Sequence, residues 1–509
     1  MGVNGFRVTL AGLGILFLSA ALWAQAGVAT QSQNQGQNQA DKSVPSTQQE
    51  PAKTPPSEPE VKITAREAEE LFHTVDEILE FDSKETGLAV KHSVKRRLTS
   101  RDEVLKFLTD HMKDEDTRRL QRSELVLKKF GLLPRDFDLE KLLLALLGEQ
   151  IAGYYDPKTK TVNLLDWIPA MEQEPVLAHE LTHALQDQAI GLERFMKKGD
   201  RDLAESRKEP KAEDIENDEM NDARQAVVEG QAEAVMLDYA LKPTGHSLVD
   251  SPEIVSAMES EMQNGTADSS VFKSAPLFLR ESLTFPYNWG LKFEIRMMEM
   301  GGRDKAFAGV LANPPHTARQ IMQPETYLSG EKLEPMRVVD FAHDFKNYER
   351  FDVGAIGEDD TAVMIEQYAG KQVSERLYRE WRGAYYYAVH AKGNASGPLG
   401  VMYLSRWSNA EKAGEFASVY ARAMHDRYKS VKEVAGKAEQ LATKSEASQS
   451  DYTVNVLKGR HEWSTEEGPV IVEAQNDIVL VTESLDAATT ETLERELFAS
   501  AKPAAARQN

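Results

Sequence analysis

The sequence predicts an α+β protein in which a mainly helical unit with a small sheet is followed by a second α+β unit. Three observations support this. The chain has 509 residues, too many for one ordinary core, so two or three domains are expected. Helical apolar spacing dominates residues 61–334, interrupted by the strand-like run Thr161–Leu165. In residues 335–509, strand-like runs alternate with helices, which predicts an accessory α+β domain.

Composition limits the classes of function. The formal net charge is −22, so nucleic acid and anionic lipid would repel the protein, and neither is an expected partner. The sequence contains no cysteine, which excludes disulfides, thiolate catalysis and zinc bound by Cys. A metal ion would have to be held by His, Asp or Glu. The sequence leaves the oligomeric state open.

The first residues are typical of an export signal. Arg7 is the only charged side chain among residues 1–26, an apolar run follows it, and residues 24–26 fit the small-x-small cleavage pattern. We expect cleavage after Ala26 and an exported protein, periplasmic or secreted, with no later membrane span. An uncleaved anchor is the alternative. Residues 27–60 are rich in Gln, Ser and Pro, which predicts a disordered linker.

The elements of residues 61–334 are predicted in chain order. A helix capped by Thr64 places four apolar side chains on one face: Leu71, Val75, Ile78 and Leu79. Residues 138–153 are apolar nearly all round, which predicts a buried helix. The strand Thr161–Leu165 follows, and then a helix with Pro175 in its first turn.

An acidic segment at residues 200–222 is expected to be a solvated loop or face. A strong helix is predicted at residues 222–241. Residues 284–290 are predicted as a loop that leads into a helix ending at Gly301 and Gly302.

The accessory domain is predicted to contain strands at residues 383–391 and 399–407 and a hairpin turning at residues 475–477. A helix is predicted at residues 408–428, and Ser408 and Glu411 form a candidate capping box at its start. Five aromatic residues of the strand-like stretches are expected in the core, with a binding surface as the alternative: Trp381, Tyr385, Tyr386, Tyr387 and Trp407.

Residues 175–188, PVLAHELTHALQDQ, contain two histidines four positions apart with a glutamate beside the first. On a helix, His179 and His183 share one face and can point at one metal ion, while Glu180 can reach a water bound to that ion. This HExxH spacing supplies two ligands and a general base from one turn. The alternative is an exposed helix that happens to carry two histidines.

A catalytic zinc site needs a third protein ligand. Glu229 and Glu233 are again four positions apart, and they are embedded among small or apolar residues. A carboxylate is costly there unless it is paired or bound to metal. We assign Glu229 as the third ligand and Glu233 as a group that orients a histidine. The alternative is that both are exposed surface acids.

HELTH followed by Glu-Gly-x-Ala resembles the gluzincin zinc metallopeptidases, with the nearest motifs in the aminopeptidase-type gluzincins and the minigluzincins. The resemblance covers roughly residues 140–330 and implies a zincin-like fold that holds Zn²⁺ through His179, His183 and Glu229. In the aminopeptidase-type enzymes, a Pro-Tyr-x-x-Gly stretch carries a tyrosine that hydrogen-bonds the developing oxyanion. Residues 286–290 are similar, so the resemblance assigns this role to Tyr287.

The chain departs from the aminopeptidases at the strand that grips the free amino terminus of a substrate. Their Gly-x-Met-Glu-Asn motif lies well upstream of HExxH, whereas residues 170–173, which look superficially similar, lie on the approach to the helix of His179. This departure favours cleavage within a chain. We also expect Thr161–Leu165 to line the cleft and to pair with an extended peptide.

The sequence therefore predicts an exported zinc peptidase, an endopeptidase, that acts on a peptide or protein substrate. Glu180 is the expected general base, and zinc with Tyr287 is expected to stabilise the oxyanion. Tyr287 could equally be a packed core residue, and His316 in NPPHTARQ is an alternative donor. The alternative function is a zincin-fold binding or scaffold protein of the cell envelope without activity.

Overall fold

The fold is described from a computed structural model. The described residues are 62–104, 106, 114–150, 153–196, 202–206, 208–251, 253, 270–435 and 455–499. The expected export signal at residues 1–26 and the expected linker at residues 27–60 lie outside them, so both, together with export itself, stay predictions. In the part of the chain that the structure describes, no helix has both the length and the apolar character that a membrane span needs.

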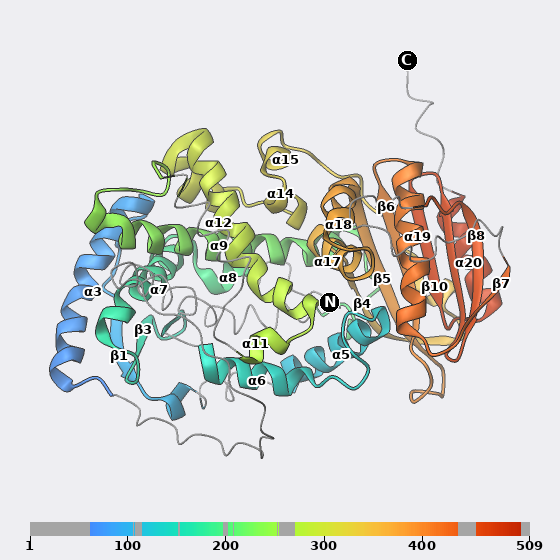
Figure 1. Ribbon diagram of the computed structural model, residues 1–509, viewed down its shortest axis with the longest axis horizontal. Helices are drawn as coiled ribbons and strands as arrows, with labels where there is room; N and C mark the ends of the chain where they lie inside the picture. The colour runs from blue at the N-terminus through green and yellow to red at the C-terminus, as the bar shows by residue number, and fades with distance from the viewer. Residues whose placement is uncertain are drawn as a thin grey trace, which may run out of the picture.

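The chain forms an α+β protein with a three-stranded mixed sheet and a seven-stranded antiparallel sheet. Figure 1 shows the small sheet among the helices on the left and the large sheet on the right. The two longest helices among the described residues, α9 (Ala212–Leu241) and α12 (Leu277–Asp304), lie against each other between the two sheets.

The first described helix, α3 (Ala65–Thr86), begins where the sequence predicts it. The Thr64 hydroxyl accepts from the Glu67 N–H, and the Glu67 carboxylate accepts from the Thr64 N–H, which completes a capping box. The four apolar side chains expected on its inner face are buried.

The helix α6 (Leu139–Gln150) corrects the expectation of a fully buried helix. Leu139, Leu143 and Leu146 pack into the core, but Leu144 is 41% exposed. In the described part of the chain, α6 packs against α5 (Asp114–Phe130) and α11 (Ser270–Ser274). The run of leucines in the sequence therefore predicts more burial of α6 than the structure shows.

The small sheet has the order β1 (Lys95–Thr99), β3 (Thr161–Leu165), β2 (Gly153–Asp156). The strand Thr161–Leu165 is confirmed, but it pairs with β1 on one side, in parallel, and with β2 on the other, antiparallel. Both of its edges are occupied by these partners. The expectation that an extended peptide pairs with β3 is therefore wrong, and β2 is the edge strand beside α7 (Ala170–Ile190).

The helix that carries HExxH, α7, begins at Ala170, so the expectation that Pro175 lies in its first turn is wrong. The added turn is held by Gln173, whose side-chain amide exchanges hydrogen bonds with the backbone of Leu165 and also donates to the Ile168 carbonyl. These bonds attach the start of α7 to the end of β3, which helical periodicity alone could not reveal.

The acidic segment is also corrected, since residues 212–222 form the first turns of α9. Asp218 and Glu219 are buried rather than solvated. Each accepts a hydrogen bond from a distant backbone N–H: Asp218 from Ala355 at 2.9 Å and Glu219 from Ala318 at 2.9 Å. Hydrogen bonds to residues this far away in the sequence cannot be predicted from the local pattern of charges.

Residues 284–290, expected as a loop, lie within α12, and Pro286 is inside the helix. The expected end of this helix is close to correct, because Gly302 leaves helical geometry with a φ of 69°. That positive φ favours glycine over other residues.

The large sheet has the order β4-β5-β6-β10-β9-β8-β7, with every neighbouring pair antiparallel. Its strands are β4 (Tyr348–Ala355), β5 (Trp381–Ala391), β6 (Gly400–Trp407), β7 (Val431–Ala435), β8 (Gly459–Thr465), β9 (Gly468–Gln475) and β10 (Ile478–Glu483). The two strands predicted at residues 383–391 and 399–407 are thus confirmed as β5 and β6, and the hairpin turning at residues 475–477 as β9–β10.

Helices cover both faces of this sheet. The longer ones are α17 (Glu358–Ala369), α18 (Lys371–Leu377), α19 (Ala410–Arg427) and α20 (Ala487–Phe498). The capping box expected from Ser408 is wrong, because the Asn409 side chain instead accepts from the N–H groups of Glu411 and Lys412. Short helices connect the larger elements: α8 (Leu192–Met196), α13 (Val310–Ala312), α14 (Ala318–Met322), α15 (Pro324–Leu328) and α16 (Phe341–Asp344).

The strand aromatics lie in the core, as expected. Tyr385, Tyr386 and Tyr387 are each 0% exposed, and alternate residues belong to two clusters on opposite faces of the sheet. Trp381 and Trp407 are also buried.

The helical part and the large sheet share their hydrophobic clusters. One cluster contains Leu71 of α3 and Val481 of β10, and the other contains Ile215 of α9 and Leu480 of β10. The proposed division at residue 334 stays a prediction, but each cluster includes residues from both sides of it.

A buried ion network also joins α5 to the large sheet. Glu483 on β10 lies 2.6 Å from the Arg427 guanidinium and 3.7 Å from Lys129 Nζ on α5. Burial raises the pKa of Glu483, but the two cations outweigh burial and lower the pKa to about 2. Glu483 is therefore ionised in the folded protein at neutral pH.

Glu483→Gln should destabilise the protein by about 3–5 kcal/mol, because it leaves the buried Arg427 without its counter-ion and leaves Lys129 with Glu467 alone. Urea unfolding at pH 7 measures the loss. The folded pKa of Glu483 is depressed from 4.5 to about 2, so this contribution is present above pH 4.5 and is lost as the pH falls through 2. The difference in unfolding free energy between Glu483→Gln and wild type should therefore become smaller as the pH is lowered from 4.5 toward 2. Glu462→Gln, at a more exposed ion pair with Arg460, should cost under about 1 kcal/mol; equal losses would contradict the prediction.

Candidate metal centre

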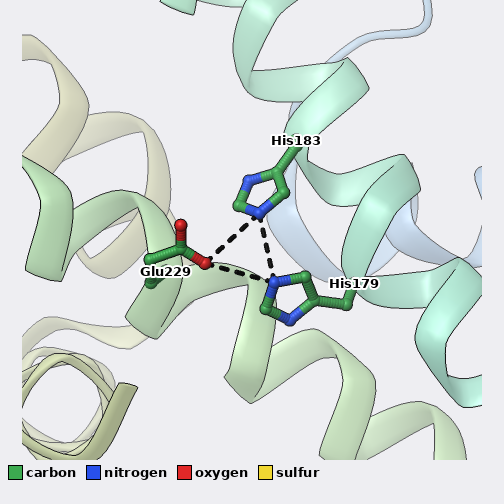
Figure 2. A group of neighbouring side chains, drawn as sticks. All are labelled: His179, His183 and Glu229. Carbon is green, nitrogen blue, oxygen red and sulfur yellow. Dashed lines mark hydrogen bonds and ion pairs between the residues drawn. The ribbon is translucent and has the colours of Figure 1, made fainter. Parts of the chain in front are cut away.

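His179 and His183 lie on one face of α7, one turn apart, and both are buried, with exposures of 2% and 0%. Their Nε2 atoms are 3.1 Å apart. Figure 2 shows the two rings pointing toward a common position. The structure therefore excludes the exposed helix that was the alternative to a paired site.

Glu229 reaches the same position from α9. Its Oε2 lies 3.2 Å from His179 Nε2 and 3.4 Å from His183 Nε2 (Figure 2). Glu229 and Glu233 are both buried, which excludes the alternative of surface acids. The three ligand atoms thus come from two helices that pack against each other.

The spacing of these atoms fits a tetrahedral ion. Ligands about 2.0–2.1 Å from a tetrahedral zinc ion are separated from one another by about 3.3 Å. The three separations here are 3.1, 3.2 and 3.4 Å. The donor set of two imidazoles and one carboxylate is also one that zinc accepts.

The far nitrogen of each histidine has its own partner. His179 Nδ1 lies 3.2 Å from Glu233 Oε2, a position from which Glu233 can orient the imidazole of His179. His183 Nδ1 lies 2.9 Å from Gln186 Oε1. Both partners can accept a hydrogen bond from an Nδ1–H, and in the tautomer protonated at Nδ1 alone each Nε2 directs its lone pair at the shared position.

Gln186 was missed from the sequence, although it lies three residues after His183 and so on the same helix face. Its amide nitrogen donates to the Val228 carbonyl and to Gln231 Oε1, both at 3.0 Å. Gln231 in turn donates to the Ala306 carbonyl at 2.9 Å. A chain of amides therefore connects His183 to α9 and to the turn that follows α12.

The two carboxylates of the group favour positive charge beside them. Burial lowers the pKa of His179, but hydrogen bonds to Glu229 and Glu233 outweigh burial and raise the pKa to about 10. Burial raises the pKa of Glu229, yet His183 and His179 lower it overall. Three electron-pair donors that face one another at hydrogen-bond distance need a proton or a metal ion between them.

Glu180 is buried beside this group and is tied to the small sheet. The Tyr155 N–H on β2 donates to Glu180 Oε2 at 2.7 Å. Gly153 allows the close approach of β2 to α7, since a Cβ there would lie 3.2 Å from Val176 Cγ1 and 3.8 Å from Glu180 Cγ. Burial is the main cause that raises the pKa of Glu180. The role of β2 was missed because its four residues give little periodic signal.

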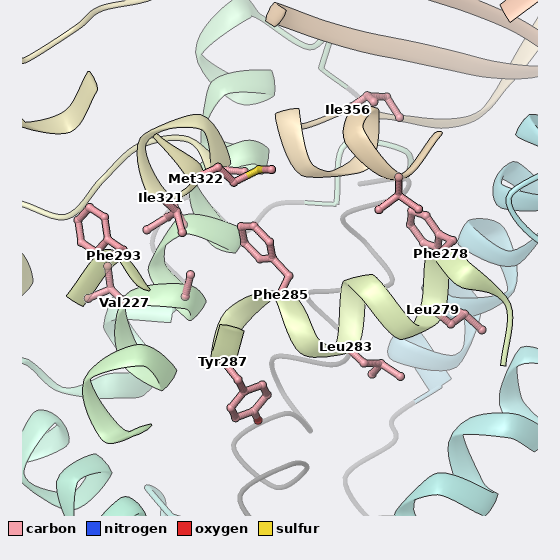
Figure 3. Packing of buried hydrophobic residues seen from close by; sticks show 14 of the residues in the cluster. Val227, Phe278, Leu279, Leu283, Phe285, Tyr287, Phe293, Ile321, Met322 and Ile356 are labelled. Atoms are coloured by element: carbon pink, nitrogen blue, oxygen red, sulfur yellow. The ribbon is translucent and has the colours of Figure 1, made fainter. Parts of the chain in front are cut away.

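Tyr287 lies near the same histidines. Its ring stacks on His179 with a centroid separation of 6.3 Å and an interplanar angle of 24°. Figure 3 shows Tyr287 and Phe285 leaving α12 on opposite sides. Tyr287 is 3% exposed and belongs to the main hydrophobic cluster, so it is both a core residue and a neighbour of the site.

His316 lies elsewhere. It is exposed, in the turn before α14. The start of α14 docks on Glu219, which is ten residues, or about 15 Å, along α9 from Glu229.

Two glycines let α9 and α12 meet next to Glu229. A Cβ on Gly230 would lie 2.2 Å from the Gly290 carbonyl carbon, and a Cβ on Gly290 would lie 2.1 Å from the Ala226 carbonyl oxygen. The Glu-Gly-x-Ala and Pro-Tyr-x-x-Gly stretches therefore contact each other through their glycines. This backbone contact places Glu229 and Tyr287 on the same side of the crossing, facing α7.

One other group of three possible ligands occurs among the described residues: His343, Asp344 and Glu496. It differs from the first group in that His343 is exposed and Arg337 donates to Glu496. A cation already accompanies these acids, so the buried group is the stronger metal candidate.

Comparison of the chain with protein-family models, with curated proteins and with solved structures found no match.

Gly230→Ala should destabilise the protein by at least about 3 kcal/mol, because the new methyl group would overlap backbone rather than a flexible side chain. Urea unfolding gives the change in free energy. The control is Gly309→Ala, at an exposed helical position whose nearest atom would be 3.3 Å away, where the expected change is under about 1 kcal/mol. A Gly230 variant as stable as this control would show that the two helices do not cross here.

Proposed function

We propose that the protein is an exported zinc-dependent endopeptidase of the gluzincin type, with a zincin-like catalytic unit. The main support is the convergence of His179 Nε2, His183 Nε2 and Glu229 Oε2 within 3.4 Å of one another. Glu180 lies on the same helix, and Glu233 and Gln186 orient the two imidazoles. A histidine pair packed only for stability would not need two Nε2 atoms and a carboxylate oxygen directed at one point.

Zinc bound by these three residues would lower the pKa of a water molecule and polarise the carbonyl of a peptide bond. Glu180 acts as the general base and takes the proton of the attacking water. It later passes that proton to the leaving amine. Burial raises the pKa of Glu180, which favours a carboxylate that must both accept and release a proton. The Tyr155 N–H holds Oε2, so Oε1 is the oxygen that exchanges the proton.

The edge strand β2 supports cleavage within a chain. The Tyr155 N–H is directed away from β3 and toward Glu180. Gly153 lies two residues earlier on the strand, so its backbone N–H and C=O face the same edge of β2, beside α7. An extended peptide that paired along β2 would pass Glu180 without needing a free amino terminus.

The experiment is a paired measurement of bound zinc and of hydrolysis of an unstructured protein substrate, on wild type and Glu180→Gln. We expect one zinc per chain in both proteins and cleavage only by wild type, with a rate at least about 10²-fold above the variant. Glu174→Gln, on the same helix, is the matched control and should cleave normally. If both bind zinc and neither cleaves, the protein is the catalytically silent scaffold; if wild type binds no zinc, the metal site itself is rejected.

Tyr287→Phe should reduce kcat by about 10²–10³-fold with zinc content unchanged, because it removes a hydrogen bond made to the oxyanion. His316→Ala is the contrast and should retain activity, since His316 is exposed. Steady-state kinetics with zinc analysis separates the two residues. Full activity of the Tyr287 variant together with loss in the His316 variant would transfer the role to His316.

A further inference from the structure

Tyr155 on β2 makes two hydrogen bonds to α7, one through its backbone and one through its side chain. Its N–H donates to Glu180 Oε2 at 2.7 Å, and its hydroxyl donates to Asp187 Oδ2 at 2.8 Å. All three residues are buried. The reaction proposed above uses the N–H of Tyr155, whereas the buried hydroxyl has no part in it.

The two acceptors lie on the same face of α7. Glu180 and Asp187 are seven positions apart on this helix, which is two turns and about 10 Å along its axis. Tyr155 therefore lies alongside α7, with its backbone at one acceptor and the far end of its ring at the other. One hydrogen bond alone would leave β2 free to pivot about Glu180, whereas two bonds to a rigid helix also fix the direction of the strand.

Asp187 is itself held in place. Its Oδ1 accepts the Leu192 N–H at 3.1 Å, and its Oδ2 lies 2.5 Å from Lys160 Nζ in addition to the Tyr155 hydroxyl. Both carboxylate oxygens therefore have partners at the end of α7. These partners remain when the Tyr155 hydroxyl is removed, so its removal does not leave an unpaired buried charge.

The strand needs such an attachment because its own pairing is slight. β2 has four residues, and in the described part of the chain its ladder pairs it with β3 alone. A short edge strand with one neighbour is only marginally held by its ladder. Burial and the hydrogen bond to Asp187 raise the pKa of Tyr155, so the hydroxyl stays protonated at neutral pH and remains a donor.

We propose that Tyr155 is a positioning residue for the hydrolysis of the peptide bond, acting through Glu180. Its hydroxyl, bound to Asp187, holds β2 against α7, so that the Tyr155 N–H keeps Glu180 Oε2 fixed and Oε1 free to exchange the proton. This role rests on the proposed function. Because a misplacement of about 1 Å can cost about 10²-fold in rate, a hydroxyl remote from the reacting atoms can control the chemical step.

The test compares wild type with Tyr155→Phe, each as the full-length chain loaded with one equivalent of zinc, in steady-state hydrolysis of a labelled unstructured protein. Tyr155→Phe should lower kcat by at least about tenfold and leave KM within about twofold of wild type. Zinc content should not change, and Tm should fall by no more than about 4 °C, since one hydrogen bond is lost. Amide hydrogen exchange of residues 153–156 should become at least about tenfold faster.

Tyr154→Phe is the matched control. It removes a hydroxyl from the neighbouring residue, which lies on the opposite face of β2 and whose hydroxyl bonds to Thr99. Its kcat should stay within about twofold of wild type. A kcat loss as large as that of Tyr155→Phe would show that any loosening of β2 has this effect, and would overturn the role of the Tyr155 hydroxyl.

Two other results would also overturn the inference. An unchanged kcat in Tyr155→Phe would show that Glu180 does not depend on the hydroxyl. A raised KM with unchanged kcat would show that the hydroxyl serves only the pairing of substrate along β2. In both cases wild type still cleaves, so the proposed function stands. Wild type that binds zinc and does not cleave would instead overturn the proposed function, and the catalytic role of Tyr155 with it.

Discussion

The backbone contact between Gly230 of α9 and Gly290 of α12 is the constraint on which the candidate centre depends. Because neither residue has a side chain, the two longest helices approach until their main chains touch. Glu229 is the residue before this contact, and Tyr287 is one turn before Gly290. Both side chains are therefore directed by the same crossing toward the histidines of α7. The side-chain amides of Gln186 and Gln231 connect His183 of α7 to α9 and to the residues after α12.

The parts of this arrangement that local pattern controls could be predicted from the sequence. His179 and His183 are four apart on a strongly helical segment, so their shared face follows from helix geometry. Glu229 and Glu233 are carboxylates among small and apolar residues, and the cost of burying them made a metal-directed role the best prediction. The α+β class and the strand Thr161–Leu165 followed from periodicity in the same way.

The parts that long-range contacts control could not be predicted. The first turns of α9 look like a solvated acidic segment, yet Asp218 and Glu219 are buried because they accept N–H groups from residues more than 95 positions away. Gln173 extends α7 through bonds to β3, and this moved Pro175 into the helix interior. The central position of β3 depended on β1, which lies more than 60 residues earlier.

The continuity of α9 has a mechanical consequence. A helix of 30 residues is about 45 Å long, and this one is anchored to the large sheet near Asp218 and to α3 near Tyr239. Gly230, where the backbone of α9 contacts that of α12, lies between these two anchors and next to Glu229. If α9 tilts about this contact, the residues near Gly230 move less than the residues at its two ends. Glu229 is next to Gly230, so such a tilt would displace its carboxylate less than it would displace either end of α9.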